Sequence, residues 1–387
     1  MLRSAWMASA PGPRRRAAWF FRTSCRGALL ALWLCLPAPA SLAAGLPVVP
    51  DGGPAYRAER YETGLGPEEL GVIVNDADPL SVRIGRYYQE KRGIPDANVI
   101  HVRFAPGGTV MTRAVFEKVR AMAAAGTPAR VQAYALAWTS PYRVECMAIT
   151  AAFAFGFHRD FCASGCAPTA QSPYFDSASR APARDHRMRP AMMLAGLDFA
   201  AVKSLIDRGV ASDYTQPAGT GYLLDTGDRA RNVRAATFAN VTRRLDDRVR
   251  FVHLKADYIE NRQDVLFYFT GAARVPQLHT NTFLPGAVAD HLTSGGGRLT
   301  DSVQMSSLRW LEAGATASYG TALEPCNFPQ KFPRVDILTK RYLQGETVIE
   351  AYWKSVAMPG QGVFIGEPLA KPYGRVPAAR TARHAAP

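Results

Sequence analysis

Short apolar runs alternate with longer amphipathic stretches along most of the chain. The clearest example begins at residues 70–75, an apolar run (LGVIVN) that predicts a buried strand. A helix is expected to begin at Ser81, its N-cap, and to end at Arg92, with Gly93 as the stop signal. Residues 98–102 form the next predicted strand. This order of strand, helix and strand predicts a βαβ unit with parallel strands.

The alternation continues toward the C-terminus and predicts the fold class. Further strands are expected at residues 131–138, 192–196, 221–224, 250–252, 265–269, 313–319 and 363–365, and further helices at 112–124, 198–208, 232–245 and 346–356. Such alternation predicts an α/β domain, residues 70–373, with a mostly parallel sheet and helices on both faces. The sequence shows no internal repeat. Residues 158–190 are polar and rich in Pro, Ser and Arg, and they predict a long loop excursion.

The N-terminal segment predicts export. Residues 1–44 contain six arginines and no acid, then a short apolar core and small residues, which is typical of a secretory signal peptide. Residues 45–69 are expected to form a leader, and residues 374–387 a basic flexible tail. No later stretch is long and apolar enough to span a bilayer. We therefore expect a periplasmic or extracellular protein without a transmembrane span.

The charge distribution argues against a nucleic-acid-binding protein. The formal net charge is +14, but the predicted signal peptide holds six of the positive charges and residues 371–387 hold four more. The body of the chain therefore carries only about +4 on standard side-chain charges. A nucleic-acid binder would concentrate Lys and Arg along one face, and the pattern predicts no such partner.

Four cysteines follow the predicted signal peptide. In an oxidising compartment an even number predicts disulfides, and three pairings are possible. We expect a local bridge from Cys162 to Cys166 and a long-range bridge from Cys146 to Cys326. His158, Cys162 and Cys166 are spaced four residues apart and could bind zinc, but disulfide formation is the preferred interpretation. No metal and no cofactor are expected.

Polar residues directly after the first strand form one candidate binding site. Asn75, Asp76 and Asp78 precede a predicted helix, where they could bind a cation or a substrate hydroxyl. The alternative is that they form the turn and favour the helix dipole. The motifs G-x-G-x-x-G, G-x-x-x-x-G-K-[ST], H-E-x-x-H and G-x-S-x-G are absent, so the sequence lacks the common signals for dinucleotide, P-loop, zinc-peptidase and serine-hydrolase chemistry.

Residues 266–331 hold the remaining candidates. Cys326 could be a thiolate nucleophile with a histidine base, His279 or His291. Asp290 and His291 could instead act as a general acid/base pair. The loop residues Ser294, Gly295 and Gly296 could present backbone amides to an anion. The alternatives are an oxidised Cys326, an Asp290 that binds local backbone and a glycine run that only makes a turn.

Several strings together resemble an uncharacterised bacterial family that occurs in species with exosortase-type protein-sorting systems. The resemblance spans roughly residues 70–373, and the strings are VNDADPLS at 74–81, IGRYY at 84–88 with KRGIP at 91–95, DHLTS at 290–294, GATASYG at 314–320, EPCNFPQKFP at 324–333 and GEPLA at 366–370. The family has no established activity, so the resemblance implies a cell-envelope context and not a reaction.

A second resemblance is to cysteine peptidases of the gingipain and caspase type. The string YFTG at 268–271 looks like the strand end that precedes the catalytic histidine in those enzymes, which implies a similar sheet. However, Ala272 and Ala273 stand where a Gly-His-Gly motif would continue, and the following strand offers no cysteine. We therefore expect an accessory or binding protein in exosortase-linked processing of surface proteins or exopolysaccharide. The alternative is a hydrolase with a non-standard site around His279, Asp290, His291 and Cys326.

Overall fold

The computed structural model describes residues 64–163, 165–242 and 249–375. The expected signal peptide, most of the leader and nearly all of the basic tail lie outside these residues. The last part of the expected leader is part of the domain, because Leu65 is buried in the hydrophobic core and residues 67–69 form a short 3₁₀ helix, η1 (Pro67–Glu69). No helix among the described residues is long and apolar enough to cross a membrane.

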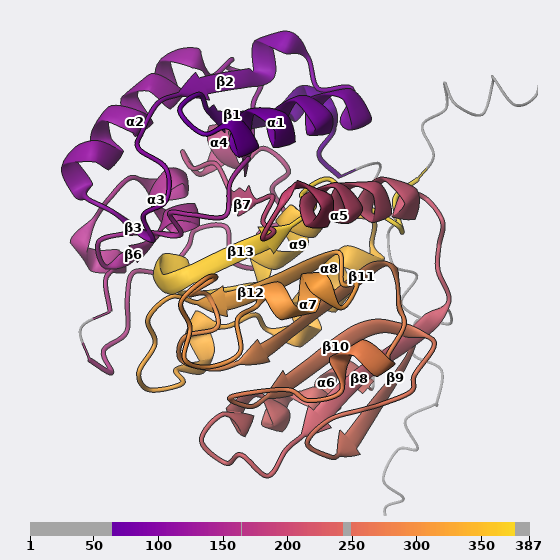
Figure 1. Cartoon of the computed structure of the whole chain (residues 1–387). Helices are drawn as coiled ribbons and strands as arrows, with labels where there is room; N and C mark the ends of the chain where they lie inside the picture. The colour runs from indigo at the N-terminus through magenta and orange to yellow at the C-terminus, as the bar shows by residue number, and fades with distance from the viewer. Residues whose placement is uncertain (1–63, 164, 243–248, 376–387) are drawn as a thin grey trace, which may run out of the picture. The chain divides into compact units, whose positions relative to one another are not determined.

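A ten-stranded sheet forms the centre of the domain (Figure 1). The strand order is β2-β1-β4-β7-β13-β12-β11-β10-β8-β9. The strands are β1 (Leu70–Asn75), β2 (Val99–Val102), β4 (Ala133–Leu136), β7 (Ala191–Met193), β8 (Gly219–Asp225), β9 (Val249–Lys255), β10 (Val265–Gly271), β11 (Phe283–Leu292), β12 (Ala317–Thr321) and β13 (Gly362–Gly366). A small second sheet contains β3 (Val110–Met111), β5 (Arg143–Val144) and β6 (Met147–Ala148).

The large sheet consists of two parallel halves that run in opposite directions. Every neighbouring pair is parallel except β12 and β13, which are antiparallel, while β13 is parallel to β7. Read from its outer edge strand, β2 or β9, each half has the strand order 2-1-3-4-5, one of the common doubly wound orders. The last strand, β13, is the fifth strand of the N-terminal half (Figure 1, yellow). The sheet therefore repeats one topology, although the sequence shows no repeat.

Helices cover both faces of the sheet, as expected. Side chains that alternate along the strands contribute to separate core clusters on the two faces. The first face packs against α1 (Pro79–Arg92), α5 (Phe199–Ser212), α6 (Phe238–Thr242), α8 (Val335–Leu343) and α9 (Val348–Ser355). The second face packs against α2 (Arg113–Gly126), α3 (Ile149–Phe155) and α7 (Leu308–Glu312). The predicted fold class, an α/β domain with a mostly parallel sheet, is confirmed.

The predicted helices differ from the observed ones mainly at their ends. The N-cap of α1 is Asp78 and not Ser81, because the Asp78 carboxylate accepts a hydrogen bond from the amide of Leu80 and Pro79 occupies the first helical position. The hydroxyl of Ser81 instead accepts from the amide of Asn75. Gly93 ends α1 in a left-handed conformation, as predicted, with a φ of 63°.

The disulfide pairing differs from the expected one. Cys146 pairs with Cys162 and Cys166 pairs with Cys326, with Cα–Cα distances of 5.2 and 5.4 Å. The 3₁₀ helix η3 (Arg159–Phe161) positions Cys162 next to Cys146, and the ring of Phe161 stacks on Phe155 of α3 at 4.5 Å between centroids. Cys166 therefore remains available to the later loop that contains Cys326. Two disulfides are typical of a protein that folds in an oxidising compartment.

In the predicted excursion, residues 158–190, the described part contains two short helices, η3 and α4 (Pro182–Asp185). It packs on the C-terminal end of α9 and the segment after it. The amide of Ser172 donates to the carbonyl of Ala357, and the amide of Asp176 donates to the carbonyl of Lys354. The long-range disulfide adds a covalent link between this excursion and the loop after β12.

Candidate functional site

The opposite direction of the two halves separates the predicted site residues into two groups. Asn75 ends β1, and Asp76 and Asp78 follow it at the carboxyl edge of the N-terminal half. Ser294, Gly295 and Gly296, after β11, and Cys326, after β12, lie at the carboxyl edge of the other half. Because β12 and β13 are antiparallel, these two carboxyl edges lie at opposite ends of the sheet. The sheet therefore offers two separate places where an α/β protein can bind ligands.

The group after β1 maintains the local turn. The side-chain amide of Asn75 donates to the carbonyl of Phe104, and its oxygen accepts from the amides of Ala77 and Phe104. Asp78 caps α1. Asp76 is exposed and lies 2.7 Å from Nδ1 of His101. Two of the three candidates thus have a structural role in the turn, which was the alternative interpretation of this pattern.

Asp290 forms a buried ion pair and does not reach solvent. One of its carboxylate oxygens lies 2.5 Å from Nη2 of Arg234, which belongs to the 3₁₀ helix η4 (Asn232–Thr237). The same guanidinium donates to the carbonyl of Thr270 at the end of β10. Burial raises the pKa of Asp290, and the charge of Arg234 opposes part of this shift. The pair connects β11 to η4 within the first face of the sheet.

His291 points to the other face of the sheet, because consecutive residues in a strand have side chains on opposite sides. Its ring is fully buried. The indole N–H of Trp310 donates to Nδ1 at 2.9 Å, and Nε2–H donates to the carbonyl of Met305 at 3.0 Å. Burial lowers the pKa of His291 to about 3. Both ring nitrogens are in use, and Asp290 and His291 do not form an acid/base pair.

The glycine loop after β11 packs closely against β12. The amide of Gly295 donates to Oε1 of Gln304, and the amide of Gly297 donates to the carbonyl of Thr321. A Cβ atom added to Gly320 would lie 2.3 Å from the carbonyl carbon of Gly296, and one added to Gly297 would lie 2.4 Å from the carbonyl oxygen of Gly320, so Gly297 and Gly320 permit a close backbone approach. The Ser294 hydroxyl lies 3.5 Å from Oδ1 of Asn327. Two amides of this loop are therefore occupied by protein acceptors and are not directed at an anion.

Cys326 has no free thiol, because it is bonded to Cys166. This excludes the predicted thiolate nucleophile in the folded, oxidised protein. The loop around it is fixed from both sides. The amide of Cys326 donates to Oε1 of Glu324, and the buried Lys331 ammonium lies 3.5 Å from the other oxygen of that carboxylate. The prediction that Cys326 is a catalytic group is therefore wrong. Its disulfide links the loop after β12 to residues 158–190.

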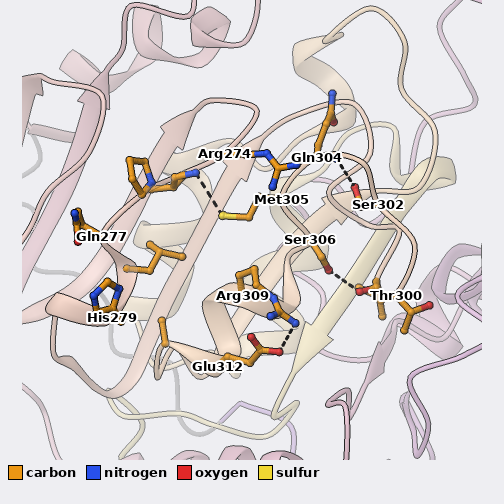
Figure 2. A pocket seen from close by; sticks show the side chains of 15 residues that line it. Arg274, Gln277, His279, Thr300, Ser302, Gln304, Met305, Ser306, Arg309 and Glu312 are labelled. Atoms are coloured by element: carbon orange, nitrogen blue, oxygen red, sulfur yellow. Dashed lines mark hydrogen bonds and ion pairs between the residues drawn. The ribbon is translucent and has the colours of Figure 1, made fainter.

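His279 lines a groove on the second face of the C-terminal half (Figure 2). The groove has a volume of about 800 Å³ and lies between the connection from β10 to β11 and the connection from β11 to β12. The two connections are joined at the end near the carboxyl edge, where the amide of Met305 donates to the carbonyl of Ala273 and Nη2 of Arg274 donates to the carbonyl of Val303. Beyond this junction the connections separate and leave the groove open.

Polar and apolar side chains are mixed along the groove. Figure 2 shows Arg274 and Gln304 toward one end and His279 and Glu312 toward the other. The Arg309 guanidinium forms an ion pair with Glu312, and partial burial raises the pKa of that carboxyl group. Apolar contacts come from Val275, Leu278, Leu299 and Met305. The volume of the groove lies within the range of ligand-binding sites.

Of the four predicted catalytic residues, only His279 lies in this groove. Sequence reasoning missed the other polar groups of the lining, namely Arg274, Gln277, Thr300, Ser302, Gln304, Ser306, Arg309 and Glu312. They occupy loops and a short helix without periodic pattern. Their position after β10 and β11 could have indicated the groove, because loops that follow parallel strands form the ligand-binding edge of a sheet.

Among the residues that the structure describes, no group of three or more His, Cys, Asp or Glu side chains could hold a metal ion. No family model matches the chain, no curated protein matches it, and no solved structure matches it.

Proposed function

We propose that this protein is an exported, non-catalytic binding protein of the cell envelope, and that its ligand occupies the groove that contains His279. Its role would be accessory, in the exosortase-linked processing of surface proteins or exopolysaccharide that the sequence resemblance implies. The disulfides and the arginine-rich N-terminal segment support the envelope location.

The observation that carries the proposal is the groove of about 800 Å³ with unpaired polar side chains in its lining. Within the described residues, the ring of His279, the amide of Gln277 and the hydroxyl of Thr300 have no hydrogen-bond partner, and all three residues are exposed. Such groups can bind a ligand without breaking an internal contact. Their solvation also makes them available without a conformational change.

The arrangement of the other candidates argues against a hydrolase. A thiol mechanism requires a free cysteine, and Cys326 is in a disulfide. A general base requires an accessible group that can accept a proton, whereas His291 is buried with both nitrogens bonded. His279 is accessible, but within the described residues no hydrogen bond or ion pair joins its ring to a nucleophile or to a group that would orient it.

The test compares binding with cleavage. The purified full chain is titrated with a fluorescently labelled library of short peptides and with a panel of envelope polysaccharide fragments, and product formation is followed in the same samples. We expect saturable binding and no cleavage. Thr300→Trp should fill the groove and weaken binding at least tenfold, because Thr300 is exposed and makes no internal hydrogen bond that the substitution would remove.

The matched control is Val82→Trp, which adds the same side chain at an exposed position of α1, outside the groove. Binding by this variant should equal that of the native chain. Equal binding by the native chain and Thr300→Trp would exclude the groove as the site. Cleavage of a probe that disappears in His279→Ala would establish the hydrolase alternative instead.

A further inference from the structure

The charges in the groove are unbalanced. Its lining contains two arginines, Arg274 and Arg309, and one carboxylate, Glu312. Arg309 is paired with Glu312, so the positive charge of Arg274 has no counterpart among the lining side chains. A ligand that brings a carboxylate to this end of the groove would meet an uncompensated cation.

Arg274 is positioned to bind such a group. One nitrogen, Nη2, donates to the carbonyl of Val303 at 2.9 Å, and this bond holds the side chain across the junction of the two connections. Within the described residues the other two nitrogens, Nε and Nη1, have no acceptor. A guanidinium presents its donors in a fixed plane that fits a carboxylate. The bond to Val303 thus reduces the freedom of the side chain before a ligand arrives.

The remaining lining favours a polypeptide over a polysaccharide. Val275, Leu278, Leu299 and Met305 give the groove apolar contact surface, and no Phe, Tyr or Trp is among its lining residues. A sugar chain would cover these side chains with hydroxyl groups and would gain little from their burial. An extended peptide with alternating apolar and acidic residues presents both kinds of side chain, because successive residues point to opposite sides.

We infer that the groove binds an extended polypeptide segment rich in Asp or Glu, with a carboxylate on Arg274. This inference rests on the proposed function, since it names the ligand class of the same groove. Arg274 lies toward one end of the groove and His279 toward the other, so the bound segment would run along the groove between them (Figure 2).

The experiment measures the affinity of the full chain for three probes at low and high salt: a peptide of alternating Leu and Glu, the same peptide with Gln in place of Glu, and an oligogalacturonate. The acidic peptide should bind at least about tenfold more tightly than its Gln analogue, and this difference should shrink at high salt. Arg274→Gln should weaken binding of the acidic peptide about tenfold and leave the Gln analogue unchanged.

The matched control is Arg86→Gln, which removes an exposed arginine from α1 in the other half of the sheet and should leave all affinities unchanged. Equal affinity for the two peptides, with loss of both in Thr300→Trp, would overturn the acidic ligand while the proposed binding function stands. Oligogalacturonate binding that depends on Arg274 and exceeds that of the acidic peptide would overturn the polypeptide class. No binding of the acidic peptide at millimolar concentration would also overturn the inference.

Discussion

The indole N–H of Trp310 donates to Nδ1 of His291, and this contact places the imidazole proton on Nε2, where it donates to the carbonyl of Met305. The arrangement fixes the neutral form of the ring. It also connects α7 and the loop before it to the C-terminal end of β11, so that the same histidine supports one wall of the groove.

The first prediction concerns acid stability. The pKa of His291 is lowered to about 3 in the folded protein, while an unfolded histidine has a pKa of about 6.5. As the pH falls below 6.5 the unfolded state binds a proton that the folded state does not bind. The contribution of His291 is therefore full above pH 6.5 and is lost toward pH 3, by about 1.4 kcal/mol per pH unit.

Urea unfolding at pH 7 and pH 5 should show a loss of about 2 kcal/mol from this residue. The control is His291→Gln, which should be less stable at pH 7 but should lack this part of the pH dependence. An NMR titration in which the ring of His291 takes a proton near pH 6 would contradict the prediction.

The second prediction concerns the buried ion pair of Arg234 and Asp290. Arg234→Met leaves a carboxylate in the core without its partner and should reduce the free energy of unfolding by about 3–5 kcal/mol. In this variant Asp290 should be protonated when folded, so its pKa lies further above the unfolded value and stability should fall as the pH rises from 5 to 8.

The double variant with Arg234→Met and Asp290→Leu is the control, because it removes both charges. It should recover at least half of the lost stability and should show no such pH dependence. If the free energy of unfolding of Arg234→Met lies within about 1 kcal/mol of that of the native chain, the ion pair does not stabilise the junction of β11 and η4.

The third prediction concerns the glycines. A Cβ at position 320 would lie 2.3 Å from the carbonyl carbon of Gly296 and 2.4 Å from the amide nitrogen of Gly297. Both atoms belong to the backbone and cannot move aside, so Gly320→Ala should cost about 3 kcal/mol or more. Gly295→Ala is the matched change, because its Cβ would approach no atom closer than 3.5 Å.

Thermal unfolding separates the two variants. Gly295→Ala should unfold within a few degrees of the native chain, and Gly320→Ala should unfold at a much lower temperature or fail to accumulate as folded protein. Equal unfolding temperatures would show that the loop after β11 does not pack on β12 as described.

The fourth prediction concerns the disulfides. Peptide mapping under non-reducing conditions should give the pairs Cys146–Cys162 and Cys166–Cys326. Sequence separations of 16 and 160 residues predict that removal of the longer link costs about 5 kcal/mol and removal of the shorter one about 3 kcal/mol. The double serine variants at each pair, compared by urea unfolding, test this order, and a reversed order would contradict it.

The fold class was predictable because strands that are buried on both faces are continuously apolar, as in residues 70–75 and 265–271. The extent of β11 was not, because Pro285, Gly286, Asp290 and His291 interrupt its apolar pattern. The helix α8 was missed for a similar reason, since its charged residues Asp336 and Arg341 are buried in this structure and hide the apolar periodicity. A short apolar run predicts a strand but not its direction relative to its neighbours, so the antiparallel pairing of β13 with β12 could not be predicted.

The candidate site was less predictable than the fold. Asp290 and His291 are adjacent in a strand, and alternation alone places their side chains on opposite faces. The alternation could therefore be recognised in the sequence, and it argues against Asp290 and His291 acting together as an acid/base pair. The cysteine pairing depends on how the excursion packs on α9, which spacing does not encode. The groove lies between two irregular connections, from β10 to β11 and from β11 to β12. Local sequence patterns do not predict the path of such loops.

The position of β13 has a consequence for how the chain reaches its native state. This strand comes from the end of the described chain, yet it pairs with β7 on one side and β12 on the other. The N-terminal half lacks its fifth strand until residues 362–366 arrive, so closure of the sheet is a late and long-range event. Without residues 362–366 the facing edges of β7 and β12 would both be unpaired, so the two halves of the sheet depend on this one strand for their connection.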